Sequence, residues 1–250
     1  MFVLFDHTSR TSYTSIQPHE ILEKIRESPS HDFSVDGRPI WNDLICKTGF
    51  ICHRVNSLDG LRDVHPSLGV EIDLRDDPIT GSIVLAHDPF AQPGAVSLGE
   101  FLDSYHHKFL ILNIKSERIE PRCLEMLREH DIQDFFFLDS SVPMIFLMNK
   151  KFGISDFACR VSELEPIDAF LRCPDLFSHL WVDCFHGMIL DQTLADHAVR
   201  LGKKTCLVSP ELQGRADDLR VYKERLREMD LFPDWICCKK DKIMDWITST

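Results

Sequence analysis

The chain has 250 residues, of which 44% are hydrophobic and 27% charged, and its formal net charge is −12. These values are typical of a soluble globular protein with one large domain or two small ones. No apolar run reaches the roughly 18 residues of a transmembrane helix, and the N-terminus, MFVLFDHTSR, lacks the basic region of a secretory signal. The acidic excess argues against nucleic acid or an anionic membrane as the main partner.

Nine cysteines are present, with no CxxC pair among them. Most lie inside apolar runs, as expected for buried thiols of a protein in the reducing cytoplasm. This usage favours neither a zinc site nor a disulfide framework. We therefore expect a cytoplasmic protein with free cysteines.

Residues 1–48 differ from the rest of the chain in their pattern. They contain one expected helix, at residues 18–28, followed by the polar stretch SPSHDFSVDGRP, which is typical of a loop. We expect this N-terminal extension to pack on the domain that follows it, rather than to form a domain of its own.

From residue 49 onward, short apolar runs rich in β-forming residues alternate with helix-like segments. The runs lie at residues 50–52, 70–73, 110–114, 135–138, 157–161, 180–185, 205–208 and 235–238. Helical patterns cover residues 119–127, 190–201 and 215–229, and Ser97 with Glu100 forms a capping box before another helix. Eight such units predict an α/β fold, a (β/α)8 TIM barrel over residues 49–250. Neither a GxGxxG nor a Walker motif is present.

Charged and polar residues follow nearly every expected strand, at the end where active sites of such barrels lie. In chain order these residues are His53, Arg54, Glu71, Asp73, Asn113, Lys115, Arg160, Glu163, Asp183, Glu211 and Lys239. Each taken alone is equally consistent with a structural ion pair, for example Arg160 with Glu163 or Lys115 with Glu71. Their concentration at one end of the barrel favours a polar site.

The residue types suit phosphoryl chemistry. Glu71 and Asp73 are two apart in a strand, so both side chains point to the same face, and Asn113 on the next strand adds a third oxygen ligand for Mg²⁺ or Ca²⁺. Two histidines, His53 and His87, are suited to acid and base roles near neutral pH. The cationic side chains available to bind a phosphate are Arg54, Lys115, Arg160 and Lys239.

The order of these motifs resembles the glycerophosphodiester phosphodiesterase family, one of the phosphatidylinositol-phospholipase-C-like barrels. The likeness rests on His53-Arg54 after the first strand, Glu71-x-Asp73 in the second, His87-Asp88 some 14 residues later, and Lys115 after the third. It implies a metal-dependent phosphoric diester hydrolase of lipid metabolism. By this likeness His53 and His87 are the acid–base pair, Glu71 and Asp73 hold a divalent metal, and Arg54 and Lys115 contact the phosphate.

The chain departs from the family pattern at two places. Val55-Asn56 stands where the family has a glycine after His-Arg, and no Pro-Glu-Asn-Thr element follows. Asn113-Ile114-Lys115 stands where the family has Glu-x-Lys, which removes one negative charge from the metal site. We therefore expect weaker metal binding than in the family.

Two other interpretations remain open at this point. In the first, the chain is a non-catalytic barrel that binds phosphate ligands at a degraded metal site. In the second, it is a Schiff-base lyase that uses Lys115. Nearby acids argue against the second, because they favour the charged ammonium. The sequence leaves open the alcohol groups of the small phosphodiester substrate, whether water or a substrate hydroxyl attacks, and the oligomeric state.

Overall fold

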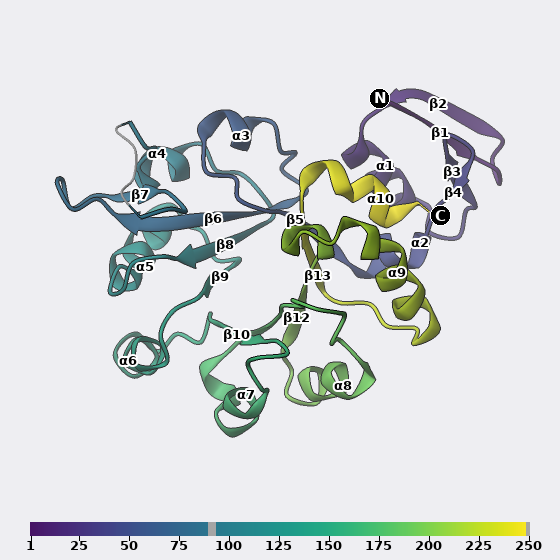
Figure 1. Ribbon diagram of the computed structural model, residues 1–250. Helices are drawn as coiled ribbons and strands as arrows, with labels where there is room; N and C mark the ends of the chain where they lie inside the picture. Colours follow the sequence, from purple (N-terminus) through teal and green to yellow (C-terminus); the bar gives the residue numbers. More distant parts are fainter. Residues whose placement is uncertain (90–93, 249–250) are drawn as a thin grey trace.

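The computed structural model describes residues 1–89 and 94–248 of the chain. Eight parallel strands curl into a barrel, and helices cover its outside (Figure 1). The barrel strands are β5 (Gly49–Cys52), β6 (Gly69–Asp76), β8 (Phe109–Ile114), β9 (Phe135–Leu138), β10 (Ala158–Val161), β11 (His179–Val182), β12 (Lys204–Val208) and β13 (Trp235–Cys238). The predicted (β/α)8 barrel is confirmed.

The barrel closes unevenly. The last strand, β13, pairs with the first, β5, from Trp235 opposite Gly49 to Cys238 opposite Cys52. Between β9 and β10, however, the described residues form a single bridge, which joins Phe137 and Phe157. We call this weakly paired junction the seam.

Helices connect the strands as the sequence predicts. They are α3 (Leu58–Arg62), α4 (Leu98–Asp103), α5 (Glu120–Glu129), α6 (Val142–Phe152), α7 (Asp168–Arg172), α8 (Gln192–Arg200), α9 (Leu219–Glu228) and α10 (Ile243–Ile247), with short 3₁₀ turns at η1 (Pro174–Leu176), η2 (Pro210–Gln213), η3 (Ala216–Asp218) and η4 (Lys240–Lys242). The predicted capping box of Ser97 and Glu100 starts α4. A short strand, β7 (Ile83–Leu85), returns antiparallel to β6 and brings the chain back toward the end of that strand.

The N-terminal residues contain more structure than the sequence pattern predicts. Besides helices α1 (Pro18–Glu27) and α2 (Asn42–Lys47), they form a four-stranded antiparallel sheet of β1 (Phe2–Asp6), β2 (Thr11–Ile16), β3 (Phe33–Val35) and β4 (Arg38–Pro39). The expected loop over SPSHDFSVDGRP is therefore wrong in part. Phe33 and Val35 are buried against β1, and this pairing with a distant segment outweighs the polar local composition.

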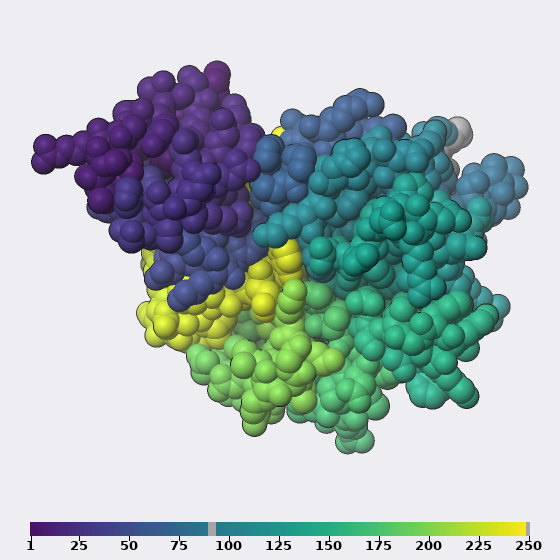
Figure 2. Space-filling model, turned by 180° about the vertical axis from the view of Figure 1, so that it is seen from behind, coloured from purple at the N-terminus to yellow at the C-terminus, as the bar shows by residue number. Residues whose placement is uncertain are grey.

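The small sheet forms a lobe at the side of the barrel (Figure 2). The Trp41 N–H donates to the Ile247 carbonyl at the end of α10, and Ile40 bridges to Thr248. On these contacts we propose that residues 1–48 fold together with the barrel, as a packed extension.

Side chains of the barrel strands alternate between the helices and the barrel interior. In β6, Val70 and Ile72 contact the outer core, while Glu71 and Asp73 take the intervening positions. In β8, Phe109 and Ile111 belong to the inner core and Asn113 continues their row toward the carboxyl end. Period-two alternation thus places three polar residues inside the barrel mouth.

Aromatic rings fill the opposite, amino end of the barrel. The Phe109 ring lies 4.7 Å from that of Trp235 and 5.7 Å from that of Phe136, measured between centroids. Gly49 is required beneath them, because a Cβ at this position would lie 2.2 Å from the Trp235 ring. This packed floor confines the polar site to the carboxyl end.

His179 is part of the aromatic floor and makes the stability of the fold depend on pH. It is 4% exposed, and burial lowers its pKa to about 3 from an ordinary value of 6.5. In the unfolded chain His179 therefore becomes protonated below about pH 6.5, whereas in the folded chain it stays neutral down to about pH 3. We expect the free energy of unfolding to fall with decreasing pH across this window, by up to about 1.4 kcal/mol per pH unit from this residue.

His179→Phe should reduce this slope, because a neutral ring takes the place of the imidazole against Phe136. Urea unfolding at a series of pH values measures the effect, with His186→Phe, at an exposed histidine, as the control. An unchanged slope in His179→Phe would show that His179 is not the group responsible.

Candidate active site

His53 and Arg54 extend from the end of β5 into the barrel mouth. The His53 N–H donates to the Cys238 carbonyl of β13, which anchors the turn. Arg54 has a φ of 56°, a left-handed conformation that is costly for a residue with a side chain. The strained turn aims the Arg54 N–H at Oε2 of Glu71, at 2.6 Å.

Glu71 is fully buried at the centre of the site. Its Oε1 accepts a hydrogen bond from Nδ2 of Asn113 at 2.8 Å, and its Oε2 lies 3.8 Å from Nε2 of His53. Burial and the neighbouring Asp73 raise the pKa of Glu71 to about 7. Burial and Arg54 lower the pKa of His53 to about 4, so the imidazole is neutral at pH 7.

Asn56 is a site residue that the sequence analysis did not identify. Its Nδ2 donates to Oδ2 of Asp73 at 2.8 Å, and its Oδ1 accepts from the Asp73 N–H at 2.9 Å. Asn56 therefore holds both the side chain and the backbone of Asp73. The sequence did carry a signal for Asn56, because Val55-Asn56 replaces the glycine that follows His-Arg in the family motif.

The oxygens around Asp73 suit a hard cation. Oδ1 of Asp73 and Oδ1 of Asn113 are buried and accept no hydrogen bond from the residues that the structure describes, and the two residues lie side by side on β6 and β8. Oxygen atoms of this kind are the ligands that Mg²⁺ and Ca²⁺ prefer. The residues present thus fit a divalent ion, although the described part of the chain holds no group of three or more acids, histidines or cysteines arranged to bind a metal.

Lys115 lies between two carboxylates at the mouth. Its Nζ is 3.7 Å from Oδ1 of Asp73 and 3.1 Å from Oδ2 of Asp139. Asp139 follows β9, the strand for which the sequence analysis named no site residue, although it comes directly after that apolar run. Asp139 also pairs with Arg160, so alternating charges run across the mouth from Arg54 to Arg160.

Arg160 pairs with acidic residues other than Glu163. Its guanidinium pairs with Asp139 and Asp183, and Asp183 also accepts from Nε2 of Gln213 at 2.7 Å. The alternative pairs Arg160–Glu163 and Lys115–Glu71 are not formed among the described residues. The role of Arg160 as a phosphate ligand stays a prediction, and these ion pairs favour a positioning role instead.

Glu163 binds the backbone of the loop after β11. It accepts hydrogen bonds from the N–H groups of Phe185, His186 and Gly187 at 2.9–3.1 Å. Desolvation opposes ionisation of this carboxylate, but the bonds from these N–H groups outweigh it and lower its pKa to about 2. Glu163 is thus a loop-positioning residue.

The last two strands contribute Glu211 and Lys239. Oε1 of Glu211 accepts from the Lys239 N–H at 2.9 Å, while the Lys239 side chain is exposed. Lys239 therefore remains accessible to an anionic group at the rim.

Arg75 holds the remaining parts of the mouth together, and it too was not identified from the sequence. Its Nε and Nη2 donate to the carbonyl oxygen of His87 at 3.1 and 3.0 Å, and its Nη1 donates to that of Lys115 at 2.8 Å. Nδ1 of His87 pairs with Oδ1 of Asp88 at 2.8 Å. One guanidinium thus fixes the backbone that carries both His87 and Lys115.

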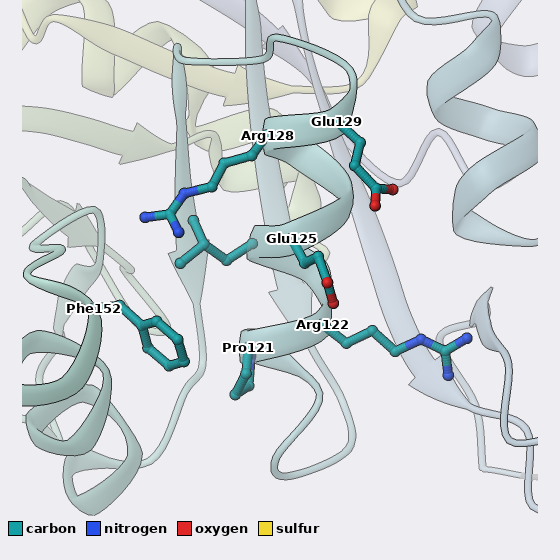
Figure 3. Close-up of a pocket in the computed structure, with 7 residues that line it drawn as sticks. Pro121, Arg122, Glu125, Arg128, Glu129 and Phe152 are labelled. Carbon is teal, nitrogen blue, oxygen red and sulfur yellow. The ribbon is translucent and has the colours of Figure 1, made fainter.

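Of the two largest cavities among the described residues, only one adjoins this site. A cavity of about 660 Å³ lies on the outer surface beside α5 and Phe152, lined by side chains such as Arg122, Glu125 and Arg128 (Figure 3). A second, of about 550 Å³, is lined by Asp139 and Arg160 and therefore adjoins the mouth. The second is the cavity of functional interest.

Comparisons with known proteins give the fold a context. No family model and no curated protein matches the chain. A solved glycerophosphoryl diester phosphodiesterase from Parabacteroides distasonis is similar, at 12% identity and a TM-score of 0.55, over 98% of this chain and 93% of that one. A glycerophosphodiester phosphodiesterase from Agrobacterium tumefaciens gives 12% and 0.56, over 78% of this chain and 99% of that one.

A third similar structure contains a bound product. It is an Oleispira antarctica phosphodiesterase in complex with sn-glycerol-3-phosphate, at 17% identity and a TM-score of 0.56, over 80% of this chain and 96% of that one. At such identities the likeness concerns the fold. This chain has the (β/α)8 fold of the solved glycerophosphodiester phosphodiesterases.

Proposed function

We propose that the chain is a divergent phosphoric diester hydrolase that cleaves a small phosphodiester at the barrel mouth. The observation that carries the proposal is the convergence of His53, Glu71, Asp73, Asn113 and Lys115 at the carboxyl ends of three adjacent strands. The same fold in three solved phosphodiesterases supports it.

The acid–base roles follow from the surroundings of the two histidines. Because His53 is neutral at pH 7, it accepts the proton of the attacking hydroxyl or water as the new P–O bond forms. His87 acts in its imidazolium form: its Nδ1–H donates to Asp88, and its Nε2–H gives the proton to the leaving alkoxide as the old P–O bond breaks.

The cationic groups provide the charge complement of the phosphate. Arg54 is 48% exposed and its Nε lies 3.5 Å from Asp73, so its guanidinium is held at the mouth yet open to solvent. Lys115 and the exposed Lys239 complete the set. Glu71, Asp73 and Asn113 would hold a divalent cation, Mg²⁺ or Ca²⁺, which when bound stabilises negative charge on the phosphate oxygens.

A hydrolysis assay tests the proposal directly. We expect the chain to hydrolyse bis-p-nitrophenyl phosphate in the presence of Mg²⁺ or Ca²⁺ and to lose this activity in a chelator. Calorimetry with the same ions measures binding separately. Ion binding without turnover of any phosphodiester would favour the alternative, a non-catalytic barrel that binds phosphate ligands.

One observation favours that alternative. Both carboxylate oxygens of Glu71 already accept hydrogen bonds, from Arg54 and Asn113, which weakens Glu71 as a metal ligand. The lyase interpretation has no such support, because Lys115 is ion-paired with two acids and is not placed as a free amine.

Asn113→Asp tests the departure from the family motif. The two side chains are nearly isosteric, so the added negative charge next to Asp73 should dominate, and we expect tighter binding of Mg²⁺ or Ca²⁺, by at least about tenfold. Calorimetry gives the affinity, and Asn56→Asp, which adds the same charge beside the other carboxylate oxygen of Asp73, Oδ2, is the comparison. Unchanged or weaker binding would show that Asn113 is not a metal ligand.

Arg75→Lys tests the guanidinium that spans the mouth. Lysine retains the charge but not the fork that reaches two carbonyl groups, so we expect kcat to fall about tenfold with a smaller change in KM. The matched control is Arg122→Lys, because Arg122 also donates to a backbone carbonyl, that of Gly81 at the far tip of the β6–β7 turn. Equal losses in both variants would contradict a specific role for Arg75.

We also propose a reducing, cytoplasmic location. All nine cysteines are free thiols in the structure, and seven of them are more than nine-tenths buried. No helix in residues 1–89 and 94–248 has the length and apolar character needed to cross a bilayer.

A further inference from the structure

The cavity beside the mouth lies at the seam of the barrel. It occupies about 550 Å³, within the range of small-molecule pockets, and opens between α6 and α7 where β9 and β10 share a single bridge. We call it the seam pocket. Its apolar lining is formed by Val142, Ile145, Leu164, Pro166, Ala169 and Phe177.

The seam pocket is continuous with the candidate site. Asp139 lines the pocket, and its Oδ2 lies 3.1 Å from Nζ of Lys115. A phosphate bound at Lys115 would therefore have one of its two ester groups at the entrance of the pocket.

The charges in the seam pocket are already paired with one another. Arg160 pairs with Asp139 and lies 3.9 Å from Glu165, and both acids line the same pocket. These pairs leave the apolar surface as the main binding element. Oγ of Ser140 is buried and has no hydrogen-bond partner among the described residues, so one donor is open to an ester oxygen.

The rim of the pocket exposes large apolar side chains. Leu164 is 73% exposed and Val142 is 60% exposed, and Phe146, one helical turn after Val142, is 58% exposed. Such a run of exposed apolar residues beside a polar site is unusual for a surface that contacts only water.

We propose that the seam pocket binds an apolar alcohol group of the substrate, so that the preferred phosphodiesters carry an alkyl chain on one side of phosphorus. This inference rests on the proposed function for the position of the phosphate. The pocket selects alcohols by hydrophobic burial. It excludes charged or highly hydroxylated alcohols, because its charged side chains are already paired with one another and are not available to bind them.

Binding of alkyl phosphates tests the pocket independently of turnover. We expect hexyl phosphate to bind at least tenfold more tightly than methyl phosphate, since each buried methylene adds up to about fourfold. Leu164→Glu and Ala169→Phe, which make the rim polar and fill the pocket, should reduce this difference to less than about threefold. Leu171→Glu, at an exposed leucine of α7 outside the pocket lining, should leave it unchanged.

The other outcomes overturn the proposal. Equal affinity of the wild-type chain for the two phosphates would show that no alkyl group enters the pocket, as would a difference that both pocket variants retain. A dimer that dissociates in Leu164→Glu, seen by sedimentation, would assign the surface to a second copy of the chain. Binding to lipid vesicles without any preference for monomeric hexyl phosphate would assign it to a membrane surface.

Turnover separates this inference from the proposed function. Hexyl p-nitrophenyl phosphate should be cleaved with a higher kcat/KM than methyl p-nitrophenyl phosphate, and Leu164→Glu should reduce this preference while Leu171→Glu, outside the pocket lining, should retain it. If neither ester is cleaved while the binding preference persists, the proposed hydrolase function fails and the seam pocket stands.

Discussion

His53→Ala and His87→Ala should each lower the turnover of a phosphodiester by about a hundred- to ten-thousandfold, the usual contribution of a general acid or base. The double variant should lose much less than the product of the two, because groups that act in one transition state are not additive. His53 should be the base, since its pKa is lowered to about 4 and it is neutral at pH 7. His87 should then be the acid.

The leaving group distinguishes the two roles. p-Nitrophenolate departs without protonation, so a p-nitrophenyl ester should rescue His87→Ala but not His53→Ala. His186→Ala, at an exposed histidine after β11, is the control and should retain full activity. Multiplicative losses with no dependence on the leaving group would mean that the two histidines do not share this chemistry.

Glu71→Gln and Asp73→Asn should abolish binding of Mg²⁺ or Ca²⁺ while the fold stays intact. Each change removes a carboxylate charge from the site and keeps its shape, and hard cations depend on that charge. Activity should fall with metal binding, by at least about a hundredfold. Glu71→Gln should melt at the same or a higher temperature in a chelator, because it removes a buried like charge beside Asp73.

Calorimetry and thermal unfolding give the two readouts for these acids. Glu165→Gln is the matched control, because Glu165 is an exposed acid on the same rim that lies near Arg160 rather than near Asn113. If both acid variants bind the ion as the wild-type chain does, these carboxylates are not its ligands.

Most of the barrel could be predicted from local pattern. Each barrel strand is a short apolar run, and its inward and outward faces follow from period-two alternation, which is why Glu71 and Asp73 were expected on one face. The N-terminal sheet could not be predicted in this way. Phe33 and Val35 are only two apolar residues in a polar stretch, and their strand depends on pairing with β1, nearly 30 residues earlier.

The site was predictable where a residue ends a strand and not where it acts through a partner. His53, Glu71, Asp73 and Asn113 follow from position alone. Asp139 directly follows the β9 run and could have been predicted in the same way. Asn56 and Arg75 gain their roles from hydrogen bonds to distant segments, and no local pattern encodes those partners.

The single bridge between β9 and β10 makes two strands of a nominally closed barrel behave as sheet edges. Unpaired backbone groups on an edge are a template for pairing with another chain, and closed barrels normally avoid this hazard. Here the ion pair of Asp139 with Arg160 joins the carboxyl ends of these strands, and α6 follows directly after β9. We therefore expect the two residues that border the candidate site also to hold the seam closed against pairing with another chain.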